Sequence, residues 1–414
     1  MAEPLFLSAR ELACTKCARK RALFLLGVFH IHKTERKIFV RYNDFGKAGI
    51  KISALGFGAM RLPMRGEGDK REVNDDLAVP LMQRAFELGV NYIDTAPGYC
   101  DKQSEISVGK ALKGYRDKVY LATKNPIENT SADDWMKRLE ASLKKLDVDY
   151  IDFYHLWGIN LAGFQEWEKL SDGPLQAADR ALREGLIKHL SFSYHDKPEN
   201  LRPIVDSGRF QSVLIQYNLL DRSNESNIAY AKEKGLGTVI MGPVGGGRLG
   251  APNEILQGLL KDKPASTAEM AMRFVLANSN VDVSLSGMSD LAMLEENAKI
   301  AAKEGHLTVD ELEKIKLMME ENKKLAQLYC TSCNYCLPCP QEIKIPTIFN
   351  MMNNHRVYGL TDHAKGAYTR LINGKNGIKG AVATECIECG ICEEKCPQKL
   401  PIIKQLQETH KTLG

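Results

Sequence analysis

The sequence lacks an apolar run long enough to cross a bilayer, which needs roughly 20 residues. The longest candidate, Ala22–Ile31, has about half that length and follows Arg19-Lys20-Arg21, but no small-residue cleavage site comes after it. We therefore expect neither a membrane-spanning protein nor a secreted one, and we expect the chain to be cytoplasmic.

The sequence also lacks a large excess of charge of either sign. Its formal net charge is +4, and residues 1–40 alone contribute eight Lys and Arg against three Asp and Glu. The rest of the 414-residue chain is nearly balanced, which argues against nucleic-acid binding by charge. Apolar and charged fractions of 44% and 26% exclude disorder, collagen and a disulfide mini-scaffold as the whole chain.

Residues 1–40 are predicted to be a separate N-terminal extension that is either disordered or a start-site artefact. A predicted hairpin begins near Arg41, and a valine codon such as that of Val40 can serve as a bacterial start. Within the extension, Cys14-x2-Cys17 has no second pair nearby to complete a tetrahedral metal site. We interpret this pair as accidental spacing.

Strand-like runs alternate with amphipathic helical segments from Ala54 to about Ile300. The eight predicted strands are Ala54–Gly58, Val90–Asp94, Val119–Lys124, Tyr150–His155, Ile187–Ser193, Val213–Asn218, Thr238–Met241 and Val283–Gly287. Predicted helices between them include Leu77–Leu88, Ala132–Leu146, Leu175–Glu184 and Ser266–Ala277. Because parallel strands need crossover connections, eight such repeats favour an α/β fold of the (β/α)8 TIM-barrel type.

A doubly wound open sheet is the alternative fold, and it would need a G-x-G-x-x-G turn after a strand. Gly56-Phe57-Gly58 is not continued in that pattern, so the dinucleotide fingerprint is absent. Beyond the repeats, a helix over Val309–Leu328 is predicted, and Ile343–Ala383 is expected to hold a helix or two.

Eight of the eleven cysteines form two groups near the C-terminus. The second group, Cys386-x2-Cys389-x2-Cys392-x3-Cys396-Pro397, has the spacing of the bacterial [4Fe–4S] run. The first group, Cys330-x2-Cys333-x2-Cys336-x2-Cys339-Pro340, is one residue shorter before its last cysteine. Two zinc sites are the alternative, because C-x2-C pairs also bind zinc. The spacing favours an α-helical, ferredoxin-like domain with two [4Fe–4S] clusters over residues 325–414.

The ligands of the two clusters are expected to cross between the groups, by analogy with two-cluster ferredoxins. On this hypothesis Cys330, Cys333, Cys336 and Cys396 bind one cluster. The other cluster then takes Cys386, Cys389, Cys392 and Cys339.

Polar side chains follow several predicted strands at their carboxyl ends, where (β/α)8 barrels place their chemistry. They are Asp94, Tyr99, Lys124 and His155. A carboxylate, a phenol, an ammonium and an imidazole at one mouth suit proton transfer. Each residue alone has an ordinary structural explanation, but their joint placement favours function.

Asp94-x4-Tyr99, Lys124 and Gly287-x7-Glu295-Glu296-Asn297 resemble the aldo/keto reductase superfamily, and with the cysteine-rich tail the chain resembles its iron–sulfur-containing branch. The resemblance implies a barrel over residues 41–310 that moves a hydride between NAD(H) or NADP(H) and a carbonyl or alcohol substrate. It also implies that Tyr99 is the general acid and that Lys124, held by Asp94, lowers the pKa of Tyr99.

One position departs from the family pattern. The family histidine follows an Asp-x-Tyr stretch by three residues, but here Asp152-Phe153-Tyr154 is followed at that distance by Trp157. His155 lies two residues earlier, on the same strand face and roughly 6.6 Å away. His155 either orients the substrate from deeper in the barrel or is a buried structural histidine.

The resemblance also implies cofactor contacts at Ser193, Gln216, Gly245, Gly246, Arg248, Gly287, Glu296 and Asn297. Ser193 and Gln216 match contacts to the nicotinamide amide, and the glycine-rich loop with Arg248 suits a pyrophosphate. Tyr194 replaces the family asparagine. Asp290 stands where many relatives carry an arginine for the 2′-phosphate, so we predict that NADH binds at least as well as NADPH.

The function expected from these features is hydride transfer coupled to electron transfer through two clusters, with a ferredoxin or flavodoxin as electron partner. The alternative is a catalytically weak, nicotinamide-binding redox sensor or adaptor. In a third interpretation the clusters only stabilise the tail.

Overall fold

The computed structural model describes residues 40–126, 131–250, 253–330, 334–373, 382–396 and 400–414. The predictions for residues 1–39, including Cys14 and Cys17, and for Cys333 therefore lie outside the described residues. Within these ranges, no helix combines the length and the apolar character needed to cross a membrane.

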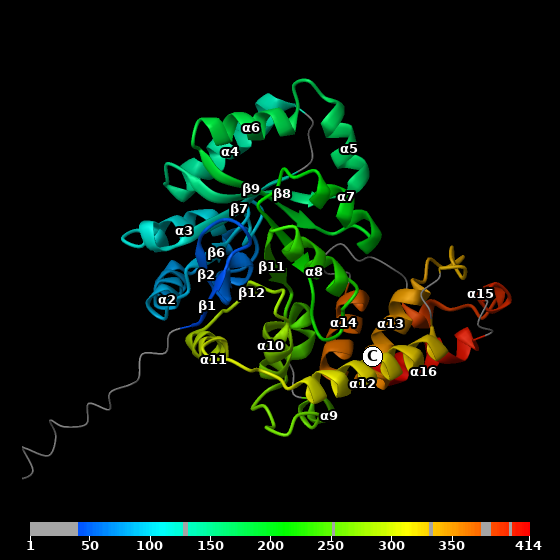
Figure 1. Ribbon diagram of the computed structural model, residues 1–414. Helices are drawn as coiled ribbons and strands as arrows, with labels where there is room; N and C mark the ends of the chain where they lie inside the picture. Colours follow the sequence, from blue (N-terminus) through cyan, green and yellow to red (C-terminus); the bar gives the residue numbers. More distant parts are fainter. Residues whose placement is uncertain (1–39, 127–130, 251–252, 331–333, 374–381, 397–399) are drawn as a thin grey trace, which may run out of the picture. The chain divides into compact units, whose positions relative to one another are not determined.

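Eight parallel strands close into a barrel in the order β10-β11-β12-β3-β6-β7-β8-β9 (Figure 1). They are β3 (Leu55–Gly58), β6 (Tyr92–Asp94), β7 (Tyr120–Pro126), β8 (Ile151–Ile159), β9 (Ile187–Tyr194), β10 (Ser212–Gln216), β11 (Gly237–Met241) and β12 (Val283–Ser286). All eight predicted strands are present, and the closed barrel confirms the (β/α)8 fold over the open sheet.

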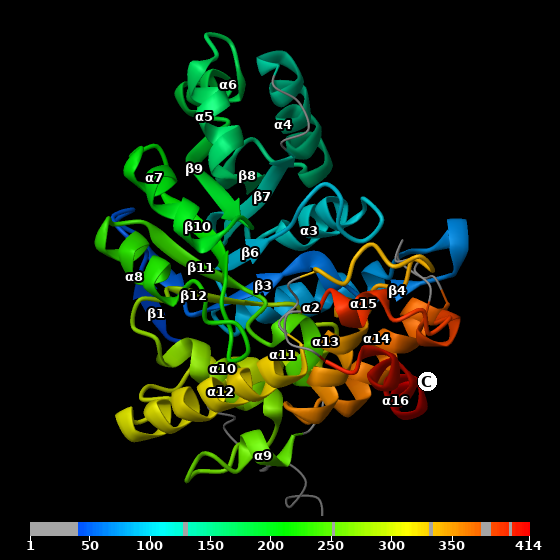
Figure 2. The same ribbon diagram turned by 90° about the vertical axis from the view of Figure 1, so that its right-hand side faces the viewer.

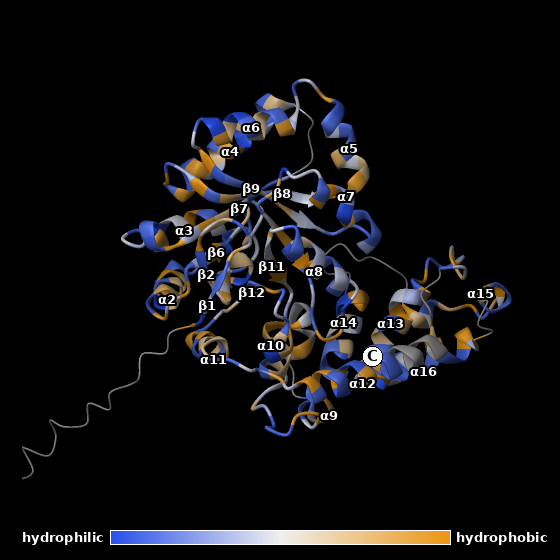
Figure 3. Cartoon of the chain, viewed as in Figure 1, coloured by the Kyte–Doolittle hydropathy of each residue, from blue (hydrophilic) through white to orange (hydrophobic). Residues whose placement is uncertain are grey.

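Helices surround the strands, and their colouring in Figure 3 alternates between polar and apolar residues, as expected for helices packed on one face. They are α2 (Asp75–Glu87), α3 (Ser104–Leu112), α4 (Ala132–Leu146), α5 (Leu161–Lys169), α6 (Pro174–Arg183), α7 (Leu201–Asp206), α8 (Glu225–Glu233), α9 (Glu254–Gln257), α10 (Thr267–Ala277), α11 (Leu291–Ala301) and α12 (Val309–Tyr329). The Ser266 hydroxyl caps α10 by accepting from the Glu269 amide. The predicted helices are confirmed, with ends shifted by at most two residues.

A hairpin closes the amino-terminal end of the barrel. Its strands β1 (Tyr42–Asp44) and β2 (Lys51–Ser53) pair antiparallel, as predicted, and present Phe45 to the barrel. The Phe45 ring is fully buried and meets the Phe153 ring edge-on at 5.1 Å. A Cβ on Gly237 would lie 2.4 Å from this ring, so only glycine permits so close an approach. The plugged end leaves the carboxyl ends of the strands as the open mouth.

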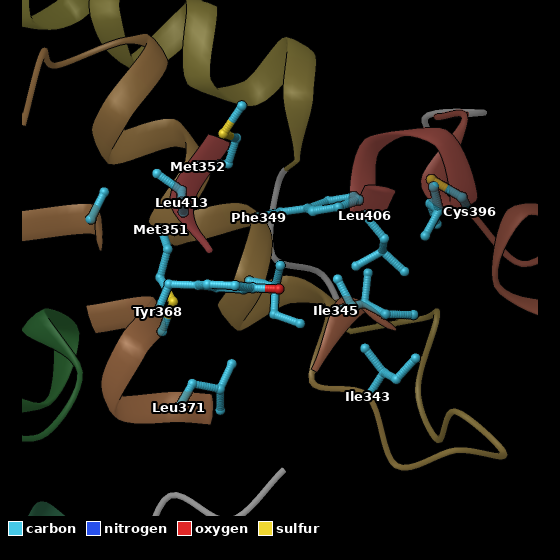
Figure 4. Close-up of a cluster of buried hydrophobic side chains, with 14 residues drawn as sticks. Ile343, Ile345, Phe349, Met351, Met352, Tyr368, Leu371, Cys396, Leu406 and Leu413 are labelled. Atoms are coloured by element: carbon cyan, nitrogen blue, oxygen red, sulfur yellow. The ribbon is translucent and has the colours of Figure 1, made fainter. Parts of the chain in front are cut away.

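The C-terminal region is helical and has its own small core. Its helices are α13 (Ile345–Arg356), α14 (Thr361–Ile372), α15 (Ile391–Glu394) and α16 (Ile402–Leu413). Helices α13, α14 and α16 lie together in Figures 1 and 2 and enclose buried side chains such as Phe349, Tyr368 and Leu406. Cys396 is buried at the edge of this core, near Leu406 (Figure 4). The prediction of a helix or two between the cysteine groups is confirmed by α13 and α14 within residues 343–373.

Candidate functional site

The barrel mouth contains a buried ion pair at the ends of two adjacent strands. Asp94 ends β6, Lys124 lies near the end of β7, and each is only 1% exposed. The Lys124 ammonium contacts the Asp94 carboxylate and donates to the Thr95 carbonyl at 2.8 Å. Its Nζ also lies 4.8 Å from the centre of the Tyr99 ring. The structure thus places three of the four predicted catalytic residues at one cavity.

The protonation of this group follows from burial and charge. Burial lowers the pKa of Lys124, but the charge of Asp94 and the contact with Tyr99 outweigh it, so the pKa is raised. Burial raises the pKa of Tyr99, and the charge of Lys124 opposes this without overcoming it. The predicted influence of Lys124 on Tyr99 has the expected sign but is smaller than the effect of burial. Tyr99 is therefore a protonated phenol at neutral pH.

Tyr99, Lys124 and Asp94 open into a cavity of about 400 Å³. Apolar side chains cover much of its wall, including Met60, Trp157, Leu214, Met241, Val244 and Leu285. Its charged side chains besides the ion pair belong to Arg61 and, when protonated, His195. An apolar cavity with a few convergent polar groups is the usual form of a small-molecule site.

A β-bulge brings Trp157 into the cavity. Leu156 pairs with Phe192 and Ile159 with Tyr194, so β8 has one residue more than β9 over this stretch. Gly158 supplies the left-handed conformation, with φ +69°. The indole meets the Tyr99 ring edge-on at 6.0 Å, and a Cβ on Gly98 would lie 3.4 Å from it. Trp157 thus forms a wall of the cavity opposite Tyr99.

His155 lies deeper inside the barrel and does not line the cavity. It is fully buried, with Nε2 at 3.4 Å from the Tyr92 hydroxyl and 3.9 Å from Asp94 Oδ2. Burial, followed by the charge of Lys124, lowers the pKa of His155 to about 3. The neutral imidazole packs near Asp94 without a hydrogen bond to it, and its burial outside the cavity favours the structural interpretation.

The predicted cofactor residues fall into two sets. Ser193, Gln216, Gly246 and Gly287 line the cavity. Gly245, Glu296 and Asn297 are not among the lining residues, and the side chain of Arg248 lies outside the described part of the chain.

Glu296 and Asn297 of the second set, and the nearby Asp290, each form a hydrogen bond with a neighbouring group. The Glu296 carboxylate accepts from the Ser266 hydroxyl at 2.7 Å. Asn297 donates to the Ser286 hydroxyl at 3.1 Å, and Ser286 itself lines the cavity. The Asp290 carboxylate accepts from the Met293 amide at 2.9 Å and so caps the start of α11.

The glycines at the mouth have conformations suited to close approach of a ligand. Gly246 and Gly247 have φ of +68° and +95°. A Cβ on Gly242 would lie 2.7 Å from the Gln216 side chain, so glycine is required there for Gln216 to take its position. These features fit a cofactor held against backbone amides.

Two lining residues with titratable side chains, Arg61 and His195, are not among the residues predicted from the sequence. Arg61 donates to the Gly246 carbonyl at 2.9 Å, and its side chain lies along Gly287. His195 lies just beyond the end of β9. The two-residue period from Ser193 could have indicated His195, but Arg61 carries no comparable signal, because its reach depends on distant loops.

The two cysteine loops meet at one pocket. It is lined by Cys336, Cys339, Cys386, Cys389 and Cys392, together with Pro338, Pro340 and several isoleucines. Cys339 and Cys336 therefore both lie beside the three early cysteines of the second group, so the pocket does not distinguish crossed from uncrossed ligands. Cys396 is buried at the edge of the helical core, and Cys333 falls outside the described residues.

The chemistry of this pocket fits a metal cluster. Burial raises the pKa of Cys392 to about 11, with further contributions from Glu393 and the neighbouring thiols. Bound iron would supply the positive charge that stabilises thiolates at such a place. In the part of the chain that the structure describes, no three Cys, His, Asp or Glu side chains are grouped as ligands of a single ion.

Two family models match the chain. Residues 54–320 match the aldo/keto reductase family, and residues 329–400 match a 4Fe-4S dicluster domain. The two matched segments correspond to the barrel with α12 and to the region that carries both cysteine groups.

Individual proteins agree with the aldo/keto reductase match. The chain is 30% identical over 265 residues to the uncharacterized oxidoreductase C215.11c of Schizosaccharomyces pombe, covering 60% of this chain and 82% of that one. It is 27% identical over 320 residues to L-galactose dehydrogenase of Arabidopsis thaliana, covering 69% and 96%. Among solved structures, the holo form of aldo-keto reductase AKR11C1 from Bacillus halodurans superposes with a TM-score of 0.57 at 27% identity, covering 67% and 96%.

Proposed function

The chain belongs to the aldo/keto reductase family, and on that premise we propose that it transfers a hydride between NAD(H) or NADP(H) and a small carbonyl or alcohol substrate. The observation that carries the proposal is the Tyr99 phenol in the cavity, with the buried Lys124–Asp94 pair beneath it. A bound nicotinamide would supply or accept the hydride.

The residues of the chain handle the proton. In reduction, the Tyr99 hydroxyl donates its proton to the carbonyl oxygen, and the charge of Lys124 stabilises the phenolate that remains. Asp94 keeps Lys124 charged and in place. In oxidation the same groups act in reverse, with the Tyr99 phenolate accepting the alcohol proton.

Four lining residues would hold the cofactor. The Ser193 hydroxyl accepts from the Gly158 amide at 2.9 Å and keeps its own proton for a carboxamide oxygen. Gln216 offers a second amide partner, and the backbone of Gly246 with the nearby Arg61 guanidinium suits a pyrophosphate. Of the other predicted cofactor contacts, Gly287 lines the cavity, whereas Glu296 and Asn297 lie outside it and each keep a side-chain oxygen that makes no hydrogen bond with the residues that the structure describes.

NADH is the cofactor we expect to bind at least as well as NADPH. Asp290 places a carboxylate at the start of α11, where it would repel a 2′-phosphate. Titration of the protein with both dinucleotides tests this preference. A clear preference for NADPH would contradict it.

In the C-terminal domain we propose two [4Fe–4S] clusters with crossed ligands, held by Cys330, Cys333, Cys336 and Cys396 and by Cys386, Cys389, Cys392 and Cys339. The support is the dicluster match, the analogy with two-cluster ferredoxins, and the pocket that places Cys339, together with Cys336, beside the second group. Each cluster would store one electron, so the pair can hold the two electrons of one hydride. The protein as isolated anaerobically should contain about eight irons.

The ligand crossing can be tested by substitution. Cys339→Ser should remove the cluster of the second group, and Cys100→Ser, a cysteine of the barrel outside both loops, is the matched control. Loss of about four irons in the first variant alone supports the crossing. Full iron content in Cys339→Ser, or a zinc-loaded colourless protein, contradicts it.

The cluster loops are open to an electron partner. Tyr335 and Ile387 are 65% and 61% exposed, and Cys389 itself is exposed. We propose a ferredoxin or flavodoxin as the partner and a reducing cytoplasm as the compartment.

The alternative function is a nicotinamide-binding redox sensor or adaptor with weak turnover. Trp157 favours it, because the indole takes space beside Tyr99 where a substrate would lie. Steady-state reduction of a panel of small carbonyls, with and without reduced ferredoxin, separates the two functions. Tyr99→Phe should abolish turnover in the enzyme and leave a sensor unchanged.

A further inference from the structure

His195 lines the cavity, but neither the proposed proton transfer nor the proposed cofactor binding uses its side chain. It makes no side-chain hydrogen bond or ion pair with any residue that the structure describes, whereas Arg61 and Ser193 are both partnered. An uncharged imidazole can both donate and accept a hydrogen bond. In this cavity it shares that property with the hydroxyls and with Gln216.

The position of His195 follows from the period of β9. His189 stacks on Phe153 inside the barrel at 4.9 Å, and Ser193 reaches the Gly158 amide of β8, so alternate residues of β9 face inward. His195 takes the next inward position, beyond the last residue of the strand. It therefore enters the mouth and not the helical layer.

The bulge in β8 makes room for this ring. A Cβ on Gly158 would lie 3.8 Å from His195 Cδ2, so the imidazole rests against the bulge, directly after Trp157. The ring centres of Trp157 and Tyr99 lie 6.0 Å apart in an edge-on arrangement. Tyr99, Trp157 and His195 thus border one part of the cavity.

A carbonyl oxygen has two lone pairs, and Tyr99 occupies one of them when it donates its proton. We propose that His195 donates a hydrogen bond to the other lone pair. The chain segment at the end of β9 thereby supplies the second donor, which β8, with Trp157 at the cavity, does not supply. This inference rests on the proposed hydride transfer at Tyr99. The imidazole remains neutral, and its hydrogen bond strengthens as negative charge develops on the oxygen.

The charge of the site is consistent with a neutral donor. Burial, followed by the charge of Lys124, lowers the pKa of His195 from its ordinary value. The other charged groups that border the cavity are Arg61 and the paired Asp94, and neither forms an ion pair with the imidazole. At neutral pH the ring therefore carries one N–H and no charge.

The test compares two substitutions in the full-length, cluster-loaded protein. His195→Leu removes the donor, and His195→Gln restores an N–H at a similar reach. His189→Gln, on the same strand but outside the cavity, is the matched control. Each variant is assayed for kcat and KM with NADH and the carbonyl panel, and NADH affinity and thermal stability are measured separately.

We expect His195→Leu to lower kcat by about 10²-fold, as removal of a preorganised donor does, with unchanged NADH affinity. His195→Gln should recover most of this loss, and His189→Gln should retain kcat. Equal losses in the Leu and Gln variants, or an unchanged kcat in His195→Leu, would overturn the inference.

Tyr99→Phe separates this result from the proposed function. If Tyr99→Phe is inactive while His195→Leu is fully active, the hydride-transfer function stands and the role of His195 is refuted. If the wild-type protein reduces no carbonyl although it binds NADH, the proposed function fails and the role of His195 fails with it.

Discussion

The barrel and the C-terminal domain hold their functional groups in opposite ways. Asp94 and Lys124 are each 1% exposed and are fixed by the strands around them. Among the described cysteines of the C-terminal domain, Cys392 lies in the short helix α15 and the others lie outside helices, at the edge of a helical core. The neighbouring Tyr335 and Ile387 are more than half exposed.

This difference indicates where each site gets its geometry. The barrel arranges its ion pair and phenol through packing and hydrogen bonds of the polypeptide alone. The cysteine loops bring several thiols together, a costly arrangement unless iron binds them. The barrel site is therefore preorganised, whereas the proposed cluster site would depend on its metal.

Removal of iron should have the largest effect on the difference between the two sites. Chelation of the anaerobic protein should unfold the C-terminal domain and leave the barrel folded, because the loops lose the bonds that hold them. Limited proteolysis and circular dichroism, before and after chelation, measure the effect. If the C-terminal domain resists proteolysis equally well with and without iron, its helical core is sufficient to keep it folded.

Loss of the Tyr99 hydroxyl should affect chemistry without affecting the fold. We expect Tyr99→Phe to lower kcat by about 10²- to 10⁴-fold, the usual contribution of a general acid. Tyr335→Phe, on an exposed cluster loop, loses the same hydroxyl and should keep the barrel reaction at its normal rate. A Tyr99→Phe variant with normal turnover would exclude Tyr99 as the proton donor.

The buried ion pair should contribute to stability in a way that surface pairs do not. Lys124→Met leaves Asp94 as an unpaired buried charge and should reduce the free energy of unfolding by about 3–5 kcal/mol. Lys169→Met breaks an exposed pair with Glu166 and should cost less than about 1 kcal/mol. Urea unfolding of both variants measures the two losses in free energy of unfolding. Similar losses in the two variants would mean that the barrel site is not preorganised by burial.

The buried His155 should make the barrel sensitive to acid. Its pKa is about 3 when folded, well below the value of 6.5 for a free imidazole. Between these values the unfolded chain binds a proton that the folded chain does not, so stability falls as the pH falls. From pH 7 to pH 5 the loss through His155 is about 2 kcal/mol. Urea unfolding at both pH values should show a smaller acid loss in His155→Gln, and an unchanged loss would contradict the assignment.

Asp290 should have the smallest effect. Asp290→Ser keeps a capping oxygen for α11 but removes the carboxylate. We expect NADPH to gain about fivefold in affinity relative to NADH, the effect of one exposed charge near a phosphate. Dinucleotide titrations measure the ratio, and no change would place the 2′-phosphate away from Asp290.

Much of the barrel could be predicted from the sequence, because each strand is a short β-rich run bounded by amphipathic helices. The predicted bounds of α4 coincide with those observed. The meeting of Asp94, Tyr99 and Lys124 also followed from the rule that parallel strands end at one mouth.

The bulge at Trp157 and Gly158 could not be predicted, because it depends on the register between β8 and β9. Arg61 was missed for a similar reason, since it enters the mouth through contacts with Gly246 and Gly287. The strand period alone did not tell whether His155 reaches the cavity, because depth in the barrel is set by packing. For Tyr99, the balance between burial and the charge of Lys124 required the three-dimensional environment.

The central claim is that a preorganised hydride site and a metal-dependent electron store operate in one chain. The most direct test is anaerobic titration of the iron-loaded protein with NADH, without added substrate, while its visible absorption is recorded. We expect NADH to bleach the cluster absorption, with up to one NADH consumed for two clusters. Absorption that NADH leaves unchanged, but that a chemical reductant bleaches, would contradict it.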